Sequence, residues 1–197
     1  MILKAALLFV MATAGAALAT PAKEAPWLPE AAAYRLTLFL GNLAPVPWQD
    51  IESAWTEPYR GSEFPTGAFD RLARGSKVDT RSLRGAMSGR DRQATFAAAT
   101  RVVASRIVEE IDSAVAAADP ADAQRALNEA RELYRAFADD IAAADPSAAR
   151  QLGRAWLELG SSLGNAGVLG AGATDPDATA ADTARKVIAD YLARNYL

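Results

Sequence analysis

The chain has 197 residues, of which 51% are hydrophobic, and its 21 basic and 24 acidic side chains give a formal net charge of −3 at neutral pH. It contains no His and no Cys. These absences exclude Ser-His-Asp and Cys-His nucleophiles, zinc or copper sites with nitrogen or sulfur ligands, and covalent haem attached through C-x-x-C-H. The basic residues are dispersed along the chain, so nucleic acid is not expected as a partner.

Residues 1–19 have the pattern of a secretory signal peptide. Lys4 precedes an apolar run over residues 5–11, and Ala17-Leu18-Ala19 ends the segment as an A-x-A cleavage site. The alternative, a membrane anchor, is disfavoured because the apolar run is shorter than the roughly 20 residues that a spanning helix needs. We expect a periplasmic protein with no membrane span after cleavage, in which residues 20–197 form a single helical domain.

The mature chain begins with one helix and then becomes irregular. Pro29 stands at the start of a predicted first helix, and Gly41 stands near its end. Residues 43–88 are rich in Pro, Gly and aromatic residues, so we predict an irregular excursion in which only Trp48–Thr56 and Thr66–Arg74 form short helices.

Long amphipathic helices are predicted after this excursion. Ser88 is the expected N-cap of a helix that runs to about Ala118. The stretch from 119 to 163 reads as two antiparallel helices, each opened by Asp-Pro, with one apolar stripe from Ala123 to Ile141 and a second from Ala149 to Leu163. A third Asp-Pro, at Asp175, opens the last helix. The predicted fold is all-α: an up-and-down four-helix bundle with an additional N-terminal helix and the irregular segment.

Without His and Cys, the metal chemistry that remains is that of oxygen ligands. Glu109 with Glu110, and Glu129 with Glu132, are hard oxygen ligands that suit Ca²⁺, a trivalent ion or iron(III) at a helix surface. The competing interpretation is an ordinary solvated face, since acids three or four residues apart are usual on amphipathic helices. No cofactor is assigned.

Two further groups of residues suggest binding. The aromatic residues of the excursion either cap one end of the bundle or form a lip for a ligand or protein partner; they include Trp48, Trp55, Tyr59 and Phe64. Basic residues beside the excursion, among them Arg71 and Arg74, either bind an anionic ligand or acidic partner, or belong to a mixed surface with the intervening acids.

One family resemblance is carried by residues 90–163. The segments DRQATFAAATRVVASRIVEEIDSA, NEARELYRAFADDIAAADP and AARQLGRAWLELGSSL resemble exported helical domains of bacterial iron uptake, namely the imelysin-like proteins and the extracytoplasmic region of iron permeases. The resemblance implies a helical bundle and a part in iron uptake. Imelysin-like proteins carry a G-x-H-x-x-E motif, which a chain without His lacks, so no site residue is transferred.

These observations favour a non-catalytic periplasmic binding or accessory protein that assists metal-ion or small-ligand handling in the cell envelope. The alternative is a protein-interaction module, adaptor or structural, that docks a periplasmic partner through the aromatic lip. An enzyme is not expected, because the familiar nucleophile arrangements are missing.

Overall fold

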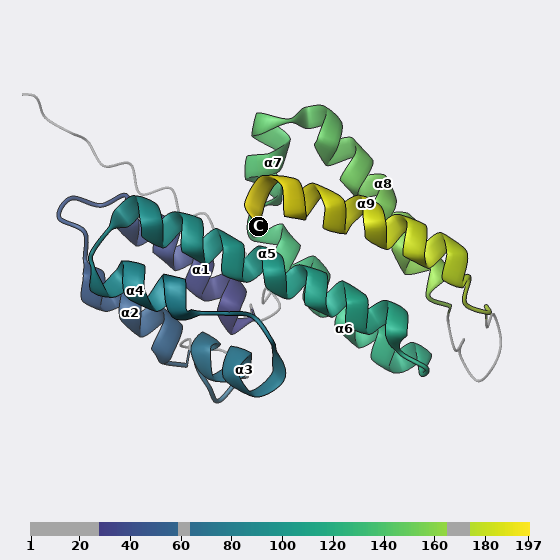
Figure 1. Cartoon of the computed structure of the whole chain (residues 1–197), viewed down its shortest axis with the longest axis horizontal. Coiled ribbons are helices and arrows are strands. Elements are labelled where there is room, and N and C mark those ends of the chain that lie inside the picture. Colours follow the sequence, from purple (N-terminus) through teal and green to yellow (C-terminus); the bar gives the residue numbers. More distant parts are fainter. Residues whose placement is uncertain (1–27, 59–63, 165–173) are drawn as a thin grey trace, which may run out of the picture.

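The computed structural model describes residues 28–58, 64–164 and 174–197, so the predicted signal peptide lies outside the described part of the chain. Every regular element in these ranges is a helix, which confirms the predicted all-α class (Figure 1). None of the described helices has the length and apolar character that crossing a membrane requires.

Nine helices lie within the described residues. They are α1 (Pro29–Gly41), α2 (Trp48–Thr56), α3 (Ala68–Gly75), α4 (Arg81–Ser88), α5 (Arg92–Ala116), α6 (Pro120–Arg135), α7 (Ala138–Ala144), α8 (Pro146–Ser162) and α9 (Ala178–Tyr196). The predicted bounds of the first two helices are confirmed.

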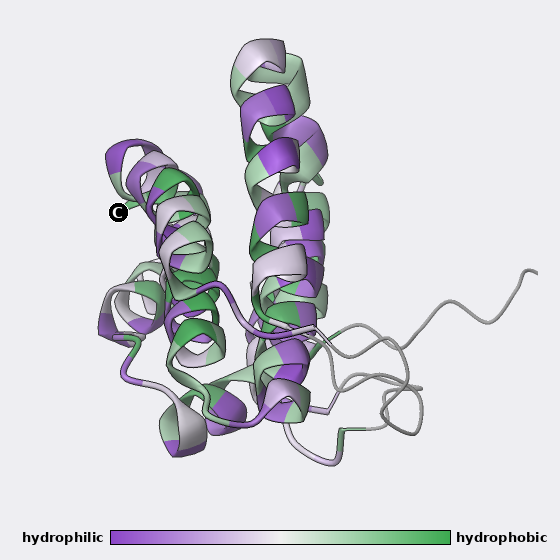
Figure 2. Ribbon diagram, turned by 90° about the vertical axis from the view of Figure 1, so that its right-hand side faces the viewer, coloured by the Kyte–Doolittle hydropathy of each residue, from purple (hydrophilic) through white to green (hydrophobic). Residues whose placement is uncertain are grey.

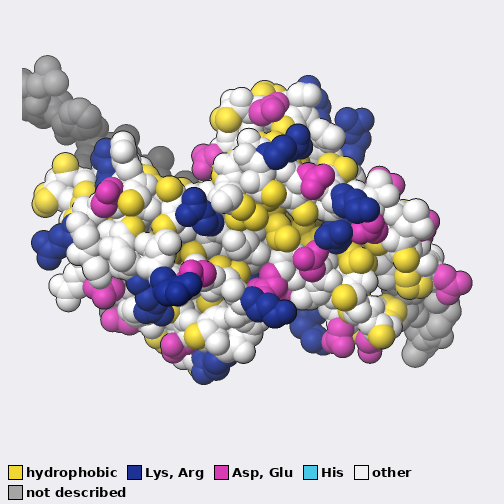
Figure 3. All heavy atoms as spheres, viewed as in Figure 1, with side chains coloured by type: hydrophobic (Ala, Val, Ile, Leu, Met, Phe, Trp, Pro, Cys, Tyr) yellow, Lys and Arg dark blue, Asp and Glu magenta, His cyan; other side chains and the backbone are white. Residues whose placement is uncertain are grey.

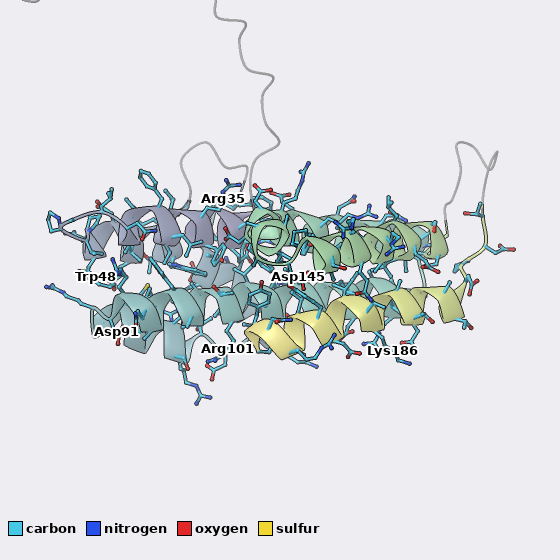
Figure 4. The ribbon with its side chains drawn as sticks, turned by 90° about the horizontal axis from the view of Figure 1, so that it is seen from above. Arg35, Trp48, Asp91, Arg101, Asp145 and Lys186 are labelled. Atoms are coloured by element: carbon cyan, nitrogen blue, oxygen red, sulfur yellow. The ribbon has the colours of Figure 1, made fainter. Side chains whose placement is uncertain are left out.

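The 25-residue helix α5 is the longest described element and connects the two halves of the molecule. Helices α1 and α4 pack against it from the N-terminal part of the chain, and α6 and α9 pack against it from the C-terminal part. Helix α8 packs mainly against α9 and also contacts α6. Seen from above, α1 and α8 lie in one layer and α5 and α9 in the other, with Arg35 and Asp145 on the first layer and Arg101 and Lys186 on the second (Figure 4).

Aspartate caps begin four of the helices. Asp119 and Asp145 each accept a hydrogen bond from the amides of the first turn and are followed by Pro, which confirms the two predicted Asp-Pro starts. The last helix begins later than predicted. Its cap is Asp177, whose carboxylate accepts hydrogen bonds from the amides of Thr179 and Ala180 at 3.1 and 3.0 Å, and Asp175 lies before it.

Two other boundaries differ from the sequence prediction. Ser88 ends α4, a helix that was not predicted, and the N-cap of α5 is Asp91, which accepts from the Ala94 amide at 3.0 Å. The predicted helix across residues 120–144 breaks after Arg135. Phe137 leaves helical geometry, with φ −134° and ψ 12°, and its ring is buried among other aromatic rings. Packing of that ring explains why the helix does not continue.

The core is one continuous apolar cluster that reaches from α1 to α9. Each helix carries hydrophobic and hydrophilic bands, as amphipathic packing requires (Figure 2). The largest fully buried side chains include Trp55, Ile51, Leu72, Ile107, Leu127, Leu159 and Ile188. Burial of a Leu, Ile or Val side chain stabilises the fold by about 1.5–3 kcal/mol, so the apolar stripes of the long helices account for their association.

Candidate functional site

Charged side chains gather where the start of α1, the whole of α3, the middle of α5 and the end of α6 meet. Glu30 lies in the first turn of α1 and is only 1% exposed, which is rare for a carboxylate. The Nε of Arg71 on α3 donates to both of its oxygens, at 3.1 and 3.2 Å. The Nη2 of Arg71 also donates to Glu129 on α6 at 3.1 Å. One guanidinium therefore ties together three helices.

Arg106, in the middle of α5, is the second arginine of this junction. Its Nη1 donates to Glu109 at 2.8 Å and to the carbonyl of Gly75 at 3.1 Å, and its Nη2 pairs with Glu110. The Glu109 carboxylate also accepts from the Ser76 hydroxyl at 2.5 Å and from the Lys77 amide at 2.7 Å. Burial raises the pKa of Glu109, but these hydrogen bonds outweigh it and leave the pKa lowered.

For Glu110 and Glu132 the net effect is the opposite, because the pKa of each is raised. Burial raises the pKa of Glu110, and the negative charges of Glu129 and Glu109 raise it further, against the lowering effect of Arg106. Burial also raises the pKa of Glu132, whose Oε1 accepts a hydrogen bond from the Leu28 amide at 2.6 Å. Glu132 thereby satisfies the backbone just before α1 and holds it against α6.

An open pocket of about 500 Å³ lies beside these contacts, between α3, α5 and α6. Its volume is within the range of small-molecule sites. In the space-filling view the surface is indented between α3 and α6, with basic and acidic side chains next to the indentation (Figure 3). The charged residues that line it are Arg71, Arg74, Arg106, Glu110, Asp122, Arg125 and Glu129.

Arg74 differs from the other pocket arginines. Arg71 and Arg106 are held by the carboxylates described above, and Arg125 pairs with Asp122 at 2.8 Å. Arg74 lies in the last turn of α3 with an exposed side chain. No hydrogen bond or ion pair joins it to any residue of the described ranges. The pocket thus presents one guanidinium whose donors are available to a ligand.

The four glutamates predicted as metal ligands all lie at this junction, in two roles. Glu110 and Glu129 line the pocket, whereas Glu109 and Glu132 anchor backbone segments. Within residues 28–58, 64–164 and 174–197, no three acidic side chains form a group that would hold a metal ion. Arg106 pairs with Glu109 and Glu110, Arg71 pairs with Glu129, and Glu132 accepts a hydrogen bond from the Leu28 amide.

The residues predicted as an aromatic lip do not form a single exposed surface. Trp55 is fully buried, stacks on Phe69 at 5.3 Å and donates its indole N–H to the Thr37 hydroxyl at 2.8 Å, so it belongs to the core. Trp48 and Phe64 are half-buried and pack against the core. Tyr59 lies outside the described residues. Phe64 has the Arg71 guanidinium over its ring at 4.6 Å, which places it near the charged junction.

Sequence reasoning did not assign Glu30, Arg106 or Arg125 to any site. Arg106 precedes Glu109 and Glu110 by three and four residues, a spacing that indicates ion pairing on one helix face. Glu30 offered no comparable signal, since its partner Arg71 is 41 residues away in the chain. Only tertiary packing brings these charges together.

Comparison with protein-family models, with curated proteins and with solved structures finds no match for this chain. The resemblance to iron-uptake domains therefore stays a prediction.

Proposed function

We propose that this protein is a non-catalytic binding protein of the periplasm, exported by its signal peptide, and that it holds a small ligand with an acidic group in the pocket between α3, α5 and α6. The observation that carries the proposal is the unpaired guanidinium of Arg74 at a pocket whose other arginines are held by carboxylates. Guanidinium groups bind carboxylates and phosphates through paired, charge-assisted hydrogen bonds.

The surrounding ion pairs support this proposal because they preorganise the pocket. The side chains of Arg71 and Arg106 are 20% and 11% exposed, and each is fixed by two carboxylates. Because these side chains are already fixed, the pocket walls around Arg74 lose little conformational entropy when a ligand arrives. As the scaffold for this pocket we propose the predicted up-and-down four-helix bundle, made from α5, α6, α8 and α9, with α1 to α4 as the N-terminal addition.

Calorimetric titration with succinate, citrate and inorganic phosphate at pH 7 and low salt tests the proposal. At least one of these anions is expected to bind, and Arg74→Gln is expected to weaken it about 10-fold or more, because a hydrogen bond to a charged group contributes about 1.5–3 kcal/mol. Arg154→Gln is the matched control, since Arg154 is exposed on α8 and does not line the pocket. Absence of binding at millimolar anion, or equal weakening by both variants, would refute the proposal.

Metal handling is less well supported by the same geometry. Glu110 and Glu129 line the pocket, but each is paired with an arginine. Docking of a periplasmic partner through Trp48 and Phe64 has no further observation in its favour, because both side chains pack against the core.

A further inference from the structure

The acidic residues of the same pocket indicate which second charged group the ligand carries. Two arginines form ion pairs with four carboxylates. Arg71 pairs with Glu30 and Glu129, and Arg106 pairs with Glu109 and Glu110. Within this set of paired residues, the four carboxylates outnumber the two arginines. Glu110 and Glu129 are the members that face the pocket, and Glu30 and Glu109 lie behind it.

The acids of the pocket wall have unused acceptor capacity. Each ionised carboxylate accepts about four hydrogen bonds, yet among the described residues Glu129 accepts a side-chain hydrogen bond only from Arg71, through Oε2. Within the described part of the chain, Glu110 is paired only with Arg106, through Oε1. Glu110 is buried and Glu129 is half-buried, so repulsion between the two acids is costly at low dielectric, and a ligand cation placed against them would relieve it.

Among the described residues, the pocket arginine without a partner and the pocket glutamates with free acceptor oxygens come from different helices. The unpaired Arg74 belongs to α3, while Glu110 and Glu129 belong to α5 and α6. A ligand that satisfies both parts carries an anionic group for α3 and a cationic donor for the other wall. An ammonium group has three N–H donors and no acceptor, which matches carboxylates that lack donors.

Building on the proposed function, we infer that the ligand is a zwitterion with both an ammonium and a carboxylate, in the class of amino acids and short peptides with free termini. A pocket of about 500 Å³ accommodates a dipeptide. The ammonium contacts Glu129 and Glu110, and the carboxylate contacts Arg74.

Three related compounds test the inference with the full chain: glycylglycine, N-acetylglycylglycine, which lacks the ammonium, and glycylglycinamide, which lacks the carboxylate. Calorimetry at pH 7 is expected to show that glycylglycine binds at least 10-fold more tightly than either derivative. Glu129→Gln is expected to weaken glycylglycine about 10-fold and to leave N-acetylglycylglycine within 2-fold. Glu158→Gln, at an exposed acid of α8, is the control and is expected to change neither.

The outcomes separate this inference from the proposed function. If N-acetylglycylglycine binds as tightly as glycylglycine and still depends on Arg74, the anion site stands and the zwitterion is refuted. If glycylglycinamide binds as tightly as glycylglycine, or if none of the three compounds and none of the simple anions binds, both are refuted. The derivative series needs only the natural protein, so the test does not depend on folding of a variant.

Discussion

Two clusters join α1 to the later helices, and they are built from opposite chemistry. The first is the charged junction, in which Glu30 meets Arg71 and Glu129. The second lies about one turn further along α1, where Tyr34 packs edge-on against Phe137 with ring centroids 6.0 Å apart. Phe137 in turn contacts Tyr134 and Tyr196 at 5.9 and 5.5 Å. The charged junction borders an open pocket of about 500 Å³, whereas the Phe137 and Tyr34 rings of the aromatic cluster are buried.

This difference indicates how the two clusters divide their roles. Aromatic side chains bury large areas without any requirement for charge balance, so they give stability directly. A buried ion pair costs desolvation and is rarely the most stable choice for a core position. The charged junction is therefore the part of the α1 contact that stability alone does not explain, which agrees with a binding role.

The largest expected effect is on the aromatic cluster. Phe137→Ala is predicted to lower the free energy of unfolding by about 3–5 kcal/mol, because the buried ring leaves a cavity among three other rings. Urea denaturation followed by circular dichroism measures this loss. Ligand affinity should stay within about 2-fold while the protein is folded, since Phe137 does not line the α3 pocket. A loss below 1 kcal/mol would show that the cluster is not a stabilising contact.

The matching change in the charged junction is Arg71→Leu. It leaves Glu30, which is 1% exposed, without its counter-charge, and an unpaired buried charge costs about 3 kcal/mol or more. The double variant Arg71→Leu with Glu30→Gln is expected to recover at least half of that loss, because residue 30 then carries no charge that needs a partner. Arg154→Leu on α8 serves as the surface control, for which the change should be within about 0.5 kcal/mol. Equal stability of the single and double variants would contradict burial of Glu30.

A smaller effect is expected at Glu109, with a defined pH dependence. Its pKa is lowered in the folded protein from 4.5, so its stabilisation is fully present above that value and is lost as pH falls through the folded pKa. Glu109→Gln should cost about 1–3 kcal/mol at pH 7, because hydrogen bonds to a charged acceptor are weakened. Urea midpoints at pH 7 and pH 3 check this. A difference between wild type and variant that is as large at pH 3 as at pH 7 would contradict it.

Much of the fold could be predicted from the sequence because its signals are local. Pro29, Asp119 and Asp145 mark helix starts through backbone geometry and capping, which act over a few residues. Helix α4 was missed because Gly85, together with the other glycines and prolines of residues 43–88, indicated irregular structure. The break at Phe137 was missed because the spacing of apolar residues continues across it.

The candidate site was less predictable because its contacts are distant in the chain. The Leu28 amide and Glu132 are 104 residues apart, and Arg71 is 58 residues from Glu129. A pattern of acids on a helix face does not reveal whether an arginine from another helix pairs with them. The sequence therefore identified the four glutamates as candidates, but not the pairing of three of them with Arg71 and Arg106 or the bond from the Leu28 amide to Glu132.

The smallest effect concerns the aromatic cluster at high pH. Burial, with further contributions from Tyr191, raises the pKa of Tyr196 to about 12. A phenol whose pKa is raised on folding contributes stability below the unfolded pKa of 10.0, and that contribution is lost as pH rises through the folded value. Tyr196→Phe, which keeps the ring contact with Phe137, should therefore reduce the loss of thermal stability between pH 9 and pH 11 while changing little at pH 7. Titration of the phenolate absorbance at high pH checks the cause. The variant should lose one tyrosine that titrates near pH 12. Loss of a tyrosine that titrates near pH 10 would instead show that Tyr196 is solvated and that the cluster is open at the end of α9.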